Sequence, residues 1–230
     1  MSALPRAAPV RGSAALNEGT VLRGRTTTLT MPLVSDYGEW SRLRAESRHF
    51  LRPWEPTWPR DDLTRMAFRR RIRRYHREIR ADEGYAFFVF EAVEGQLVGG
   101  ITLAHVKRGV TQSCSMGYWM GERFAGQGLM GDAVRAVVPF CFETLGLNRI
   151  EAATLPHNDR SIRLLKRVGF TEEGYARRFL CINGAWRDHV QFALCAGDTI
   201  DPGRLATQAE VVRPDGDRMD PFDPRFGLNL

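Results

Sequence analysis

Three observations predict that this chain forms one α/β domain, a sheet flanked by helices. Short runs rich in β-branched and aromatic residues alternate with longer runs whose apolar residues recur at helical spacing. The 230 residues, 43% of them hydrophobic, can bury one substantial core. No second apolar unit of domain size stands outside the middle of the chain. We therefore expect a domain over residues 25–198, a flexible arm over 1–24 and a loosely ordered tail over 199–230.

Composition narrows the class of protein. The four cysteines lie far apart and form neither a CxxC pair nor a Cys/His metal spacing, so we expect reduced core cysteines and no metal. No apolar run approaches the roughly 20 residues that span a bilayer. Residues 1–25 contain no hydrophobic stretch of the signal-peptide kind. These features predict a soluble, cytoplasmic protein without a membrane partner, and the net charge of +6 favours acidic partners.

The first predicted elements are one strand and one helix. Thr26–Met31 is β-branched and alternating, which predicts a strand. Asp36, with Glu39 three residues later, is typical of a capping box, in which two side chains satisfy free amides at a helix start. We expect a helix from there toward Arg48.

An aromatic loop and a second helix follow. Three prolines in residues 49–59 forbid a regular helix, so Trp54 lies in a loop that is packed as a lid or lines a pocket. From Asp61 or Asp62 a helix should run to about Ala81. Its predicted apolar face carries Phe68, Ile72, Tyr75 and Ile79.

Eight arginines occupy the other faces of this helix: Arg65, Arg69, Arg70, Arg71, Arg73, Arg74, Arg77 and Arg80. One interpretation is a basic surface for RNA or for an acidic protein. The other is a solvated helix face with a few glutamate partners. We favour a functional surface, because so many arginines with so little compensating acid repel one another.

The middle of the chain predicts three antiparallel strands and a kinked helix. Tyr85–Val93 and Gln96–Val106 are dense in β-forming residues on both sides of a glycine turn, which indicates a hairpin. A further turn leads into a strand that ends at Met120. The long helical pattern beyond it contains Pro139, which removes a backbone donor, so that helix should kink or break there.

The last third predicts a strand, a helix and a hairpin. Arg149–Leu155 reads as a strand, and Asn158 or the next residue caps a helix that Gly169 ends. A terminal hairpin is expected over Tyr175–Ile182 and Trp186–Ala196, because an Asn-Gly pair joins them.

Residues 123–130 join the strand ending at Met120 to the long helix through a basic residue and two spaced glycines. Glycine lets a backbone approach a ligand closely, and first-turn amides have no intrahelical partner, so such a loop can direct several amides at one phosphate. Arg123 would add a charge-assisted contact. The alternative is an ordinary glycine turn. The loop is neither a P-loop nor a dinucleotide fingerprint, since their further residues are missing.

Two landmarks together resemble the GCN5-related N-acetyltransferases (GNAT). The family's acetyl-CoA signature, Gln/Arg-x-x-Gly-x-Gly/Ala, matches Arg123, Gly126 and Gly128. Its second landmark, Asn-x-x-Ser followed by a helix and Gly-Phe, matches Asn158, Ser161, Gly169 and Phe170. The resemblance covers roughly residues 25–196 and implies a mixed, mostly antiparallel sheet of about seven strands, flanked by about four helices and splayed between its two central strands.

Four shorter segments are similar to the RimJ/RimL branch of this family, and to its RimJ members most: Pro53-Trp54-Glu55-Pro56, Leu155-Pro156-His157-Asn158, Gly174-Tyr175-Ala176 and Asn183-Gly184-Ala185-Trp186-Arg187-Asp188-His189. This branch acetylates the N-terminal α-amines of ribosomal proteins. The implied acceptor is the N-terminal alanine of a small-subunit ribosomal protein.

The resemblance implies acetyl-CoA as the donor substrate. Its pantetheine arm would insert between the splayed strands, its pyrophosphate would meet the glycine loop, and a backbone N–H near Met120 would polarise the thioester carbonyl. The implied donor-binding residues are Met120, Arg123, Phe124, Ala125, Gly126, Gln127, Gly128, Leu129, Met130, Asn158 and Ser161.

The implied reaction is direct attack by a neutral amine within a ternary complex. Because a free α-amine has a pKa of about 7.7 to 8.0, part of it is already neutral at pH 7 and a strong base is less necessary. Glu55 is the first candidate base, since burial in a proline-fixed aromatic loop makes a carboxylate a better base; the alternative is an exposed loop carboxylate. The expected acceptor-binding residues are Trp54, Glu55, Tyr118 and His157.

The proton donor to the departing thiolate is less clear from the sequence. Many family members place a tyrosine four residues before the glycine of Gly-Phe, and Leu165 stands there in this chain. Ser161 or Asn158 could supply a hydroxyl, an amide or a bound water instead, although Ser161 reads equally well as a first-turn helix residue. The candidate catalytic groups are therefore Glu55, Ser161 and the amide of Met120.

Two other functions remain open. The same fold could acetylate a small-molecule amine, although the basic helix argues mildly against a cationic one. It could also serve as a ribosome- or RNA-binding assembly factor, as the Arg65–Arg80 helix and Leu165 suggest.

Overall fold

A computed structural model describes residues 20–198. The strands are β1 Val21–Arg23, β2 Thr27–Thr30, β3 Tyr85–Glu91, β4 Leu97–Lys107, β5 Ser113–Met120, β6 Arg149–Thr154, β7 Thr171–Ile182 and β8 Ala185–Cys195. The helices are α1 Tyr37–Glu46, α2 Arg48–Leu51, α3 Arg65–Arg80, α4 Leu129–Pro139 and α5 Asp159–Val168, with the short turns η2 Val34–Asp36, η3 Glu122–Phe124 and η4 Phe140–Thr144. None of the helices within residues 20–198 is both long and apolar enough to cross a membrane.

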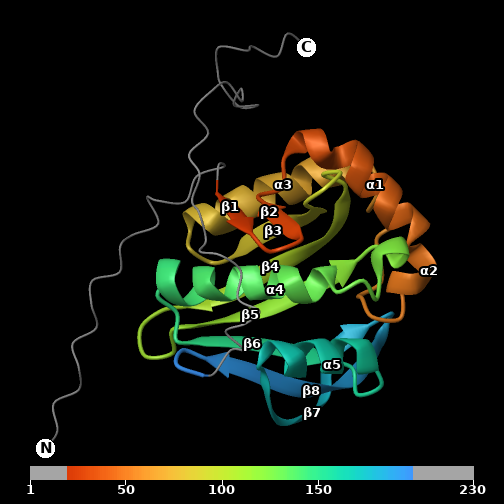
Figure 1. Ribbon diagram of the computed structural model, residues 1–230. Helices are drawn as coiled ribbons and strands as arrows, with labels where there is room; N and C mark the ends of the chain where they lie inside the picture. Colours follow the sequence, from red (N-terminus) through yellow and green to blue (C-terminus); the bar gives the residue numbers. More distant parts are fainter. Residues whose placement is uncertain (1–19, 199–230) are drawn as a thin grey trace, which may run out of the picture.

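The strands form a single sheet in the order β1-β2-β3-β4-β5-β6-β8-β7 (Figure 1). Every neighbouring pair is antiparallel except β5–β6. The predicted mixed, mostly antiparallel sheet is therefore confirmed, with eight strands in place of about seven.

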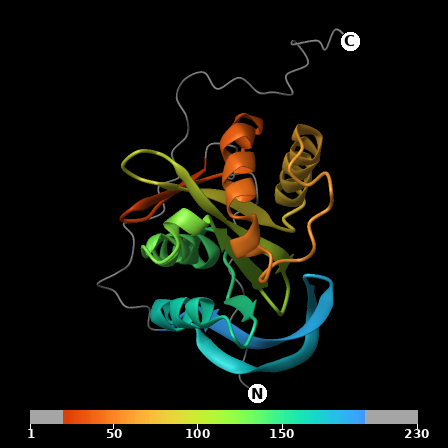
Figure 2. The same ribbon diagram turned by 90° about the vertical axis from the view of Figure 1, so that its right-hand side faces the viewer.

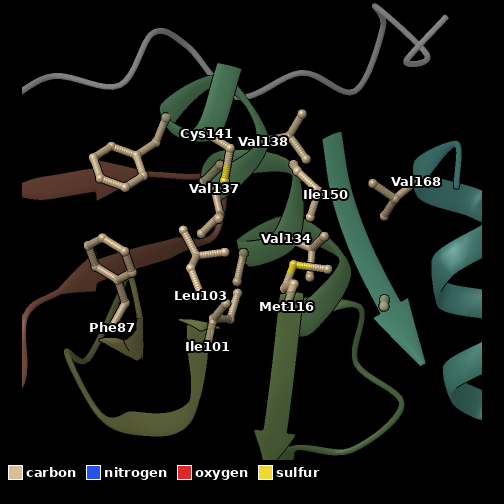
Figure 3. Packing of buried hydrophobic residues seen from close by; sticks show 14 of the residues in the cluster. Phe87, Ile101, Leu103, Met116, Val134, Val137, Val138, Cys141, Ile150 and Val168 are labelled. Carbon is tan, nitrogen blue, oxygen red and sulfur yellow. The ribbon is translucent and has the colours of Figure 1, made fainter. Parts of the chain in front are cut away.

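Helices cover both faces of this sheet, with α4 and α5 on one side and α1 and α3 on the other (Figure 2). The alternation along β3 explains how one strand serves two cores. Tyr85, Phe87 and Val89 pack into the cluster with α4, whereas Ala86 and Phe88 pack into the cluster with α1 and α3. Figure 3 shows the larger cluster, where side chains of α4 meet those of the central strands. Both faces of the central strands are thus buried, so they read as continuous apolar runs.

The extra strand lies inside the segment predicted to be a flexible arm. Val21–Arg23 pairs with β2 at the edge of the sheet, and Leu22 is fully buried. The domain therefore includes residues 20–24 as well as the predicted core. The rest of the predicted arm, 1–19, and the predicted tail, 199–230, lie outside the described residues.

Asp132 of α4 holds the turn between β1 and β2. Its carboxylate is almost buried and accepts hydrogen bonds from the amides of Arg25 and Thr26, at 3.1 and 2.9 Å, and from the hydroxyls of Thr26 and Thr27, at 3.2 and 2.9 Å. Such donors satisfy a buried carboxylate that would otherwise be costly to desolvate. This link attaches the edge hairpin to the helix that follows the glycine loop.

The predicted capping box before α1 does not form. Asp36 adopts a helical conformation and its carboxylate accepts instead from the amide of Leu33, at 2.7 Å, which closes the short turn η2. Glu39 accepts from the amide of Leu97 in β4, at 2.6 Å. A contact with a distant strand thus replaces the local one that the spacing predicted.

Helix α3 begins at Arg65, later than the sequence predicted. Thr64 is its N-cap, and the Thr64 hydroxyl accepts from the amide of Ala67 at 3.2 Å. Asp61 and Asp62 precede the helix and pair with arginines on it. The predicted apolar face is confirmed, because it is buried at Phe68, Ile72 and Tyr75 and half-buried at Ile79.

Pro139 interrupts its helix as predicted. The α-helical turns of α4 end at Pro139, and Phe140–Thr144 continues as a wider π-helical turn. The amide of Leu145 donates to the carbonyl of Phe140 at 2.9 Å, a bond that spans five residues. The local change in winding accommodates a residue that lacks an amide donor.

Candidate active site

β5 and β6 separate after a short parallel contact. Three residue pairs join them, the last at Ser115 and Glu151. Beyond that point β5 continues to Met120 beside β4, while β6 continues beside β8, and Figure 3 shows the two strands running apart. The β6-facing edge of Met116–Met120 is therefore without a strand partner among the described residues. The predicted splay between the two central strands is confirmed.

The amide of Met120 belongs to this open edge. The amide of the next residue, Gly121, donates to the carbonyl of Val98 in β4, at 2.8 Å. Successive amides along a strand point to opposite sides within the sheet. The Met120 amide is therefore directed away from β4, toward the space that β6 has left, where it can meet a ligand carbonyl.

The loop from Arg123 to α4 carries the geometry expected of a phosphate cradle. Gly126 and Gly128 have φ of 84° and 83°, a left-handed conformation that favours glycine. Gly128 is the N-cap of α4 and supplies no side-chain cap. The first-turn amides of α4, at the positive end of the helix dipole, are therefore available to bind an anion. Phe124 packs against both apolar clusters and anchors the loop.

The remaining loop residues divide into exposed and buried ones. The guanidinium carbon of Arg123 lies 4.6 Å from the centroid of the Phe124 ring, and this exposed arginine can reach a phosphate. Gln127 donates to the Arg123 carbonyl at 2.9 Å, which closes the loop. The side chains of Leu129 and Met130 pack in the core, so only the backbone of these two residues is available to a ligand.

Tyr118 and Ser161 meet across the separated strands. Tyr118 extends from β5 and Ser161 from the first turn of α5, and their hydroxyl oxygens lie 2.6 Å apart. Burial raises the pKa of Tyr118 to about 12, and the hydrogen bond with Ser161 opposes part of that rise. The phenol therefore keeps its proton at physiological pH. Leu165, one turn further along α5, is fully buried in the core and offers no polar group.

The start of α5 is shaped by Asn158 and approached by the aromatic loop. Asn158 is the N-cap, and its side-chain oxygen accepts from the amide of Ser161 at 3.2 Å. The rings of Trp54 and His157 lie 5.5 Å apart between centroids. Two predicted acceptor-binding residues from distant parts of the chain are thus adjacent at this end of the sheet.

Glu55 is held by a buried arginine that sequence reasoning did not single out. Arg44 of α1 donates to both carboxylate oxygens of Glu55 at 2.7 Å, and the indole of Trp58 donates to one of them at 2.6 Å. The guanidinium of Arg44 lies between the rings of Trp58 and Trp119, with its carbon 4.1 and 4.9 Å from their centroids. Both oxygens of Glu55 are therefore engaged in holding the loop.

The sequence of α1 contained only a weak indication that Arg44 is buried and paired. Trp40, Leu43 and Arg44 share the buried side of this helix, at spacings of three and four residues. An arginine on an otherwise apolar face needs an acidic partner, because a buried charge is costly unless it is paired. Which carboxylate fills that role depends on the fold of the loop and not on local spacing.

The candidate catalytic residues fall on two sides of β5. Tyr118 and Trp119 are neighbours in the strand, so their side chains point to opposite faces. Tyr118 meets Ser161 on the α5 face, whereas Trp119 meets the Arg44–Glu55 pair on the α1 face. The structure does not bring Glu55 together with Ser161, and the open edge of β5 lies between the two groups.

The terminal hairpin completes the surroundings of the aromatic loop. The amide of Asn183, in the turn between β7 and β8, donates to the carbonyl of Glu55 at 2.9 Å. The side chain of Arg52 donates to the side-chain oxygen of Asn183 at 3.2 Å. These bonds connect the loop after α2 with the end of the sheet that β7 and β8 form.

Comparisons with known proteins agree with this geometry. Residues 27–171 match a family model described as an acetyltransferase (GNAT) domain. The Escherichia coli K12 ribosomal protein uS5-alanine N-acetyltransferase is 36% identical over 185 residues, which cover 80% of this chain and 95% of that protein.

Solved structures give the same result. Mycobacterium smegmatis RimJ, in complex with CoA-disulfide, superposes with a TM-score of 0.73 at 32% identity, covering 78% of this chain and 88% of that one. The ribosomal-protein-S5-alanine acetyltransferase of Vibrio fischeri gives a TM-score of 0.72 at 26% identity, over 77% and 97% of the two chains. With the matched family domain, the splayed strands and the glycine loop, these similarities show that the chain belongs to the GNAT family and is an acetyl-CoA-dependent acetyltransferase.

Proposed function

We propose that this enzyme acetylates the N-terminal α-amine of a ribosomal protein, and that its acceptor is the N-terminal alanine of the small-subunit protein uS5. The observation that carries the proposal is similarity at 36% identity over 95% of the Escherichia coli uS5-alanine N-acetyltransferase. That span includes both the donor loop and the aromatic loop, so the similarity is not restricted to the donor half that all family members need.

Acetyl-CoA is proposed to bind along the open edge of β5. The amides at the start of α4, together with Arg123, would hold the pyrophosphate, since a helix N-terminus and a guanidinium both favour a phosphate oxygen. The pantetheine arm would pair with the edge of Met116–Met120, which has no strand partner in the described chain. The thioester would then lie near Met120 and the first turn of α5.

The transfer itself needs one nucleophile and one proton. The neutral α-amine attacks the thioester carbonyl carbon, and the Met120 amide stabilises the oxyanion that forms. The carbon–sulfur bond then breaks, the attacking nitrogen releases a proton to solvent water, and the CoA thiolate gains one. We assign the hydroxyl of Ser161 as the donor to that sulfur, oriented by Tyr118. The N-terminus of α5 also favours negative charge on the sulfur.

The acceptor side is proposed to be built by the aromatic loop, with Trp54 and His157 beside the N-terminal residue. Glu55 keeps this loop in place through Arg44 and Trp58 and through its carbonyl bond to Asn183. In this proposal Glu55 positions the acceptor and is not the general base. The low pKa of an α-amine makes a base unnecessary, because a sizeable fraction is neutral at pH 7.

The proposal is tested with purified protein, acetyl-CoA and a series of short peptides, by following thiol release. A peptide with the N-terminal sequence of uS5 should be acetylated faster than the same peptide with a blocked N-terminus. Equal release with both peptides would mean that a side-chain amine is the acceptor. Thiol release only with small-molecule amines would favour a small-molecule acceptor. Absence of thiol release with every amine tested would favour an assembly factor.

A further inference from the structure

The structure divides the eight arginines of α3 into two sets. Four have partners: Arg70 and Arg71 pair with Asp61 and Asp62 at 2.5 and 2.6 Å, Arg74 pairs with Glu78 at 3.4 Å, and Arg65 lies over the ring of Tyr37. Arg70 and Arg71 hold the loop before α3, Arg65 contacts α1, and Arg74 pairs within α3 itself. Their presence therefore has a structural explanation.

The other four arginines of α3 have no such partner among the described residues. Arg69, Arg73, Arg77 and Arg80 are exposed, and their side chains make no ion pair, hydrogen bond or ring contact with any residue in the range 20–198. Their offsets of four, eight and eleven residues place them within an arc of about 80°, along about 16 Å of helix. We call these four residues the arginine stripe. The stripe lies on another side of the helix from Phe68, Ile72 and Tyr75, which pack toward the sheet.

The stripe is unfavourable for an isolated protein. Like charges four residues apart destabilise a helix by a few tenths of a kcal/mol per pair. Glu78 is the only acidic residue of α3, and it is already paired with Arg74. A partner that brings negative charge would relieve this repulsion, whereas solvent alone does so incompletely.

The chemistry of the stripe favours a phosphate backbone over a protein. Protein interfaces have an apolar centre, often aromatic, from which charged residues are depleted. On α3 the exposed large apolar residue is Met66, and no exposed aromatic residue accompanies the stripe. A row of guanidinium groups without apolar anchors instead matches the regular negative charge of a nucleic acid, which is bound through phosphates without reading its sequence.

We propose that the arginine stripe docks the enzyme on RNA through the phosphate backbone. This goes beyond the acetyl transfer, and only the choice of RNA over DNA rests on the proposed ribosomal acceptor. The stripe lies on the α1 face of the sheet, so an RNA bound there leaves the α5 face and the donor loop free. The enzyme could then hold the ribosome and acetyl-CoA at the same time.

The test measures binding of a fluorescent RNA hairpin, without acetyl-CoA or peptide, between about 50 and about 200 mM salt. The variant is Arg69→Gln/Arg73→Gln. The charge-matched control is Arg163→Gln/Arg167→Gln, which removes two exposed arginines from α5. The stripe variant should bind RNA roughly tenfold more weakly and lower the slope of log K against log salt by about 1 to 2. The control should change both quantities much less.

Several results would overturn the inference. Equal weakening by the stripe variant and the control would mean that net charge alone attracts RNA. Unchanged binding in both would remove the stripe as an RNA site. Displacement of the bound RNA by polyglutamate at a lower concentration than by unlabelled RNA would assign the stripe to an acidic protein. An Arg69→Lys/Arg73→Lys variant, which keeps the charge, should retain most of the binding. Turnover on a free peptide should be equal in the unmodified protein and in all three variants, so failure of the acetylation proposal is recognised separately.

Discussion

The hydroxyl of Tyr118 lies 2.6 Å from the hydroxyl of Ser161, a contact that joins β5 to α5 beyond the point where β5 and β6 separate. A thiolate can only accept a hydrogen bond. If Ser161 donates its one hydroxyl proton to the thiolate, Tyr118 must be the donor in its contact with Ser161. In the proposed mechanism, two hydroxyls from different elements take the role of the tyrosine for which Leu165 stands in α5.

Removing the Tyr118 hydroxyl should slow the chemical step. We expect Tyr118→Phe to lower kcat by roughly 10- to 100-fold, because the Ser161 hydroxyl loses its orientation and polarisation. Affinity for acetyl-CoA, measured by calorimetry, should change less than about threefold. Tyr175→Phe is the matched control, since Tyr175 is an exposed tyrosine that bonds to Asp188.

The two hydroxyls should also act as a unit. The Tyr118→Phe/Ser161→Ala double variant should lower kcat by about the same factor as Ser161→Ala alone, as expected for residues in one network. Fully additive losses in log kcat would contradict a shared role for this pair.

The pH profile should report the acceptor amine. We expect kcat/KM to rise with pH up to about 8, as the α-amine becomes neutral, and then to level off. Because burial raises the pKa of Tyr118 to about 12, its proton is retained below that pH and no alkaline fall should begin near pH 10. A stopped-flow or discontinuous assay from pH 6 to about pH 10.5 checks this, and a fall centred near pH 9 to 10 would show that a less shifted acid is required.

Breaking the Arg44–Glu55 pair should weaken acceptor binding. Arg44→Met leaves the Glu55 carboxylate partly buried without its cation, so the aromatic loop loses its anchor. We expect the KM for peptide to rise about tenfold, with kcat and the KM for acetyl-CoA nearly unchanged. Arg42→Met, an exposed position on the same helix, is the control.

Glu55→Gln separates a positioning role from a base. A positioning role predicts a higher KM for peptide and an unaltered pH profile. A loss of kcat of about 100-fold or more at unchanged KM would identify Glu55 as the base and contradict our assignment.

Asp132 should be a stability determinant remote from the chemistry. Asp132→Asn removes a carboxylate that accepts from two amides and two hydroxyls, and we expect a loss of about 2 kcal/mol, or a Tm lower by roughly 4 to 8 °C. Differential scanning calorimetry measures this, with the exposed Glu143→Gln as control. A Tm within about 1 °C of the unmodified protein would show that solvent replaces these hydrogen bonds.

The local backbone geometry of the proposed donor site could be predicted because its determinants are local. Gly126 and Gly128 adopt a positive φ, which glycine favours, and Asn158 caps α5 as its sequence position indicated. Turn and cap chemistry depends on residues within one or two helical turns. Pro139 belongs to the same class, since the loss of one amide acts on the preceding turn.

Other contacts of the structure join distant parts of the chain, and no local pattern contains them. Glu39 bonds to the amide of Leu97, 58 residues away, in place of forming a capping box. Tyr118 and Ser161 are 43 residues apart, and Asp132 meets the β1–β2 turn more than 100 residues earlier. Side-chain partners of this kind are set by the packing of helices on the sheet. The sequence therefore indicated Glu39, Tyr118 and Ser161 but not their contacts, and it did not single out Asp132.

The arginines of α3 illustrate the same limit. Their number and spacing were visible in the sequence, but the division into paired and unpartnered sets required the positions of Asp61, Asp62 and Tyr37. Only the unpartnered set carries the inference about RNA.

The most direct test of the acetylation proposal is mass spectrometry of ribosomal-protein N-termini from cells of the source organism with and without this protein. The account predicts that acetylation at the N-terminal alanine of uS5 disappears without it and returns with the unmodified protein, but returns only partially with Tyr118→Phe. Unchanged acetylation of every ribosomal-protein N-terminus in the absence of this protein would contradict the account.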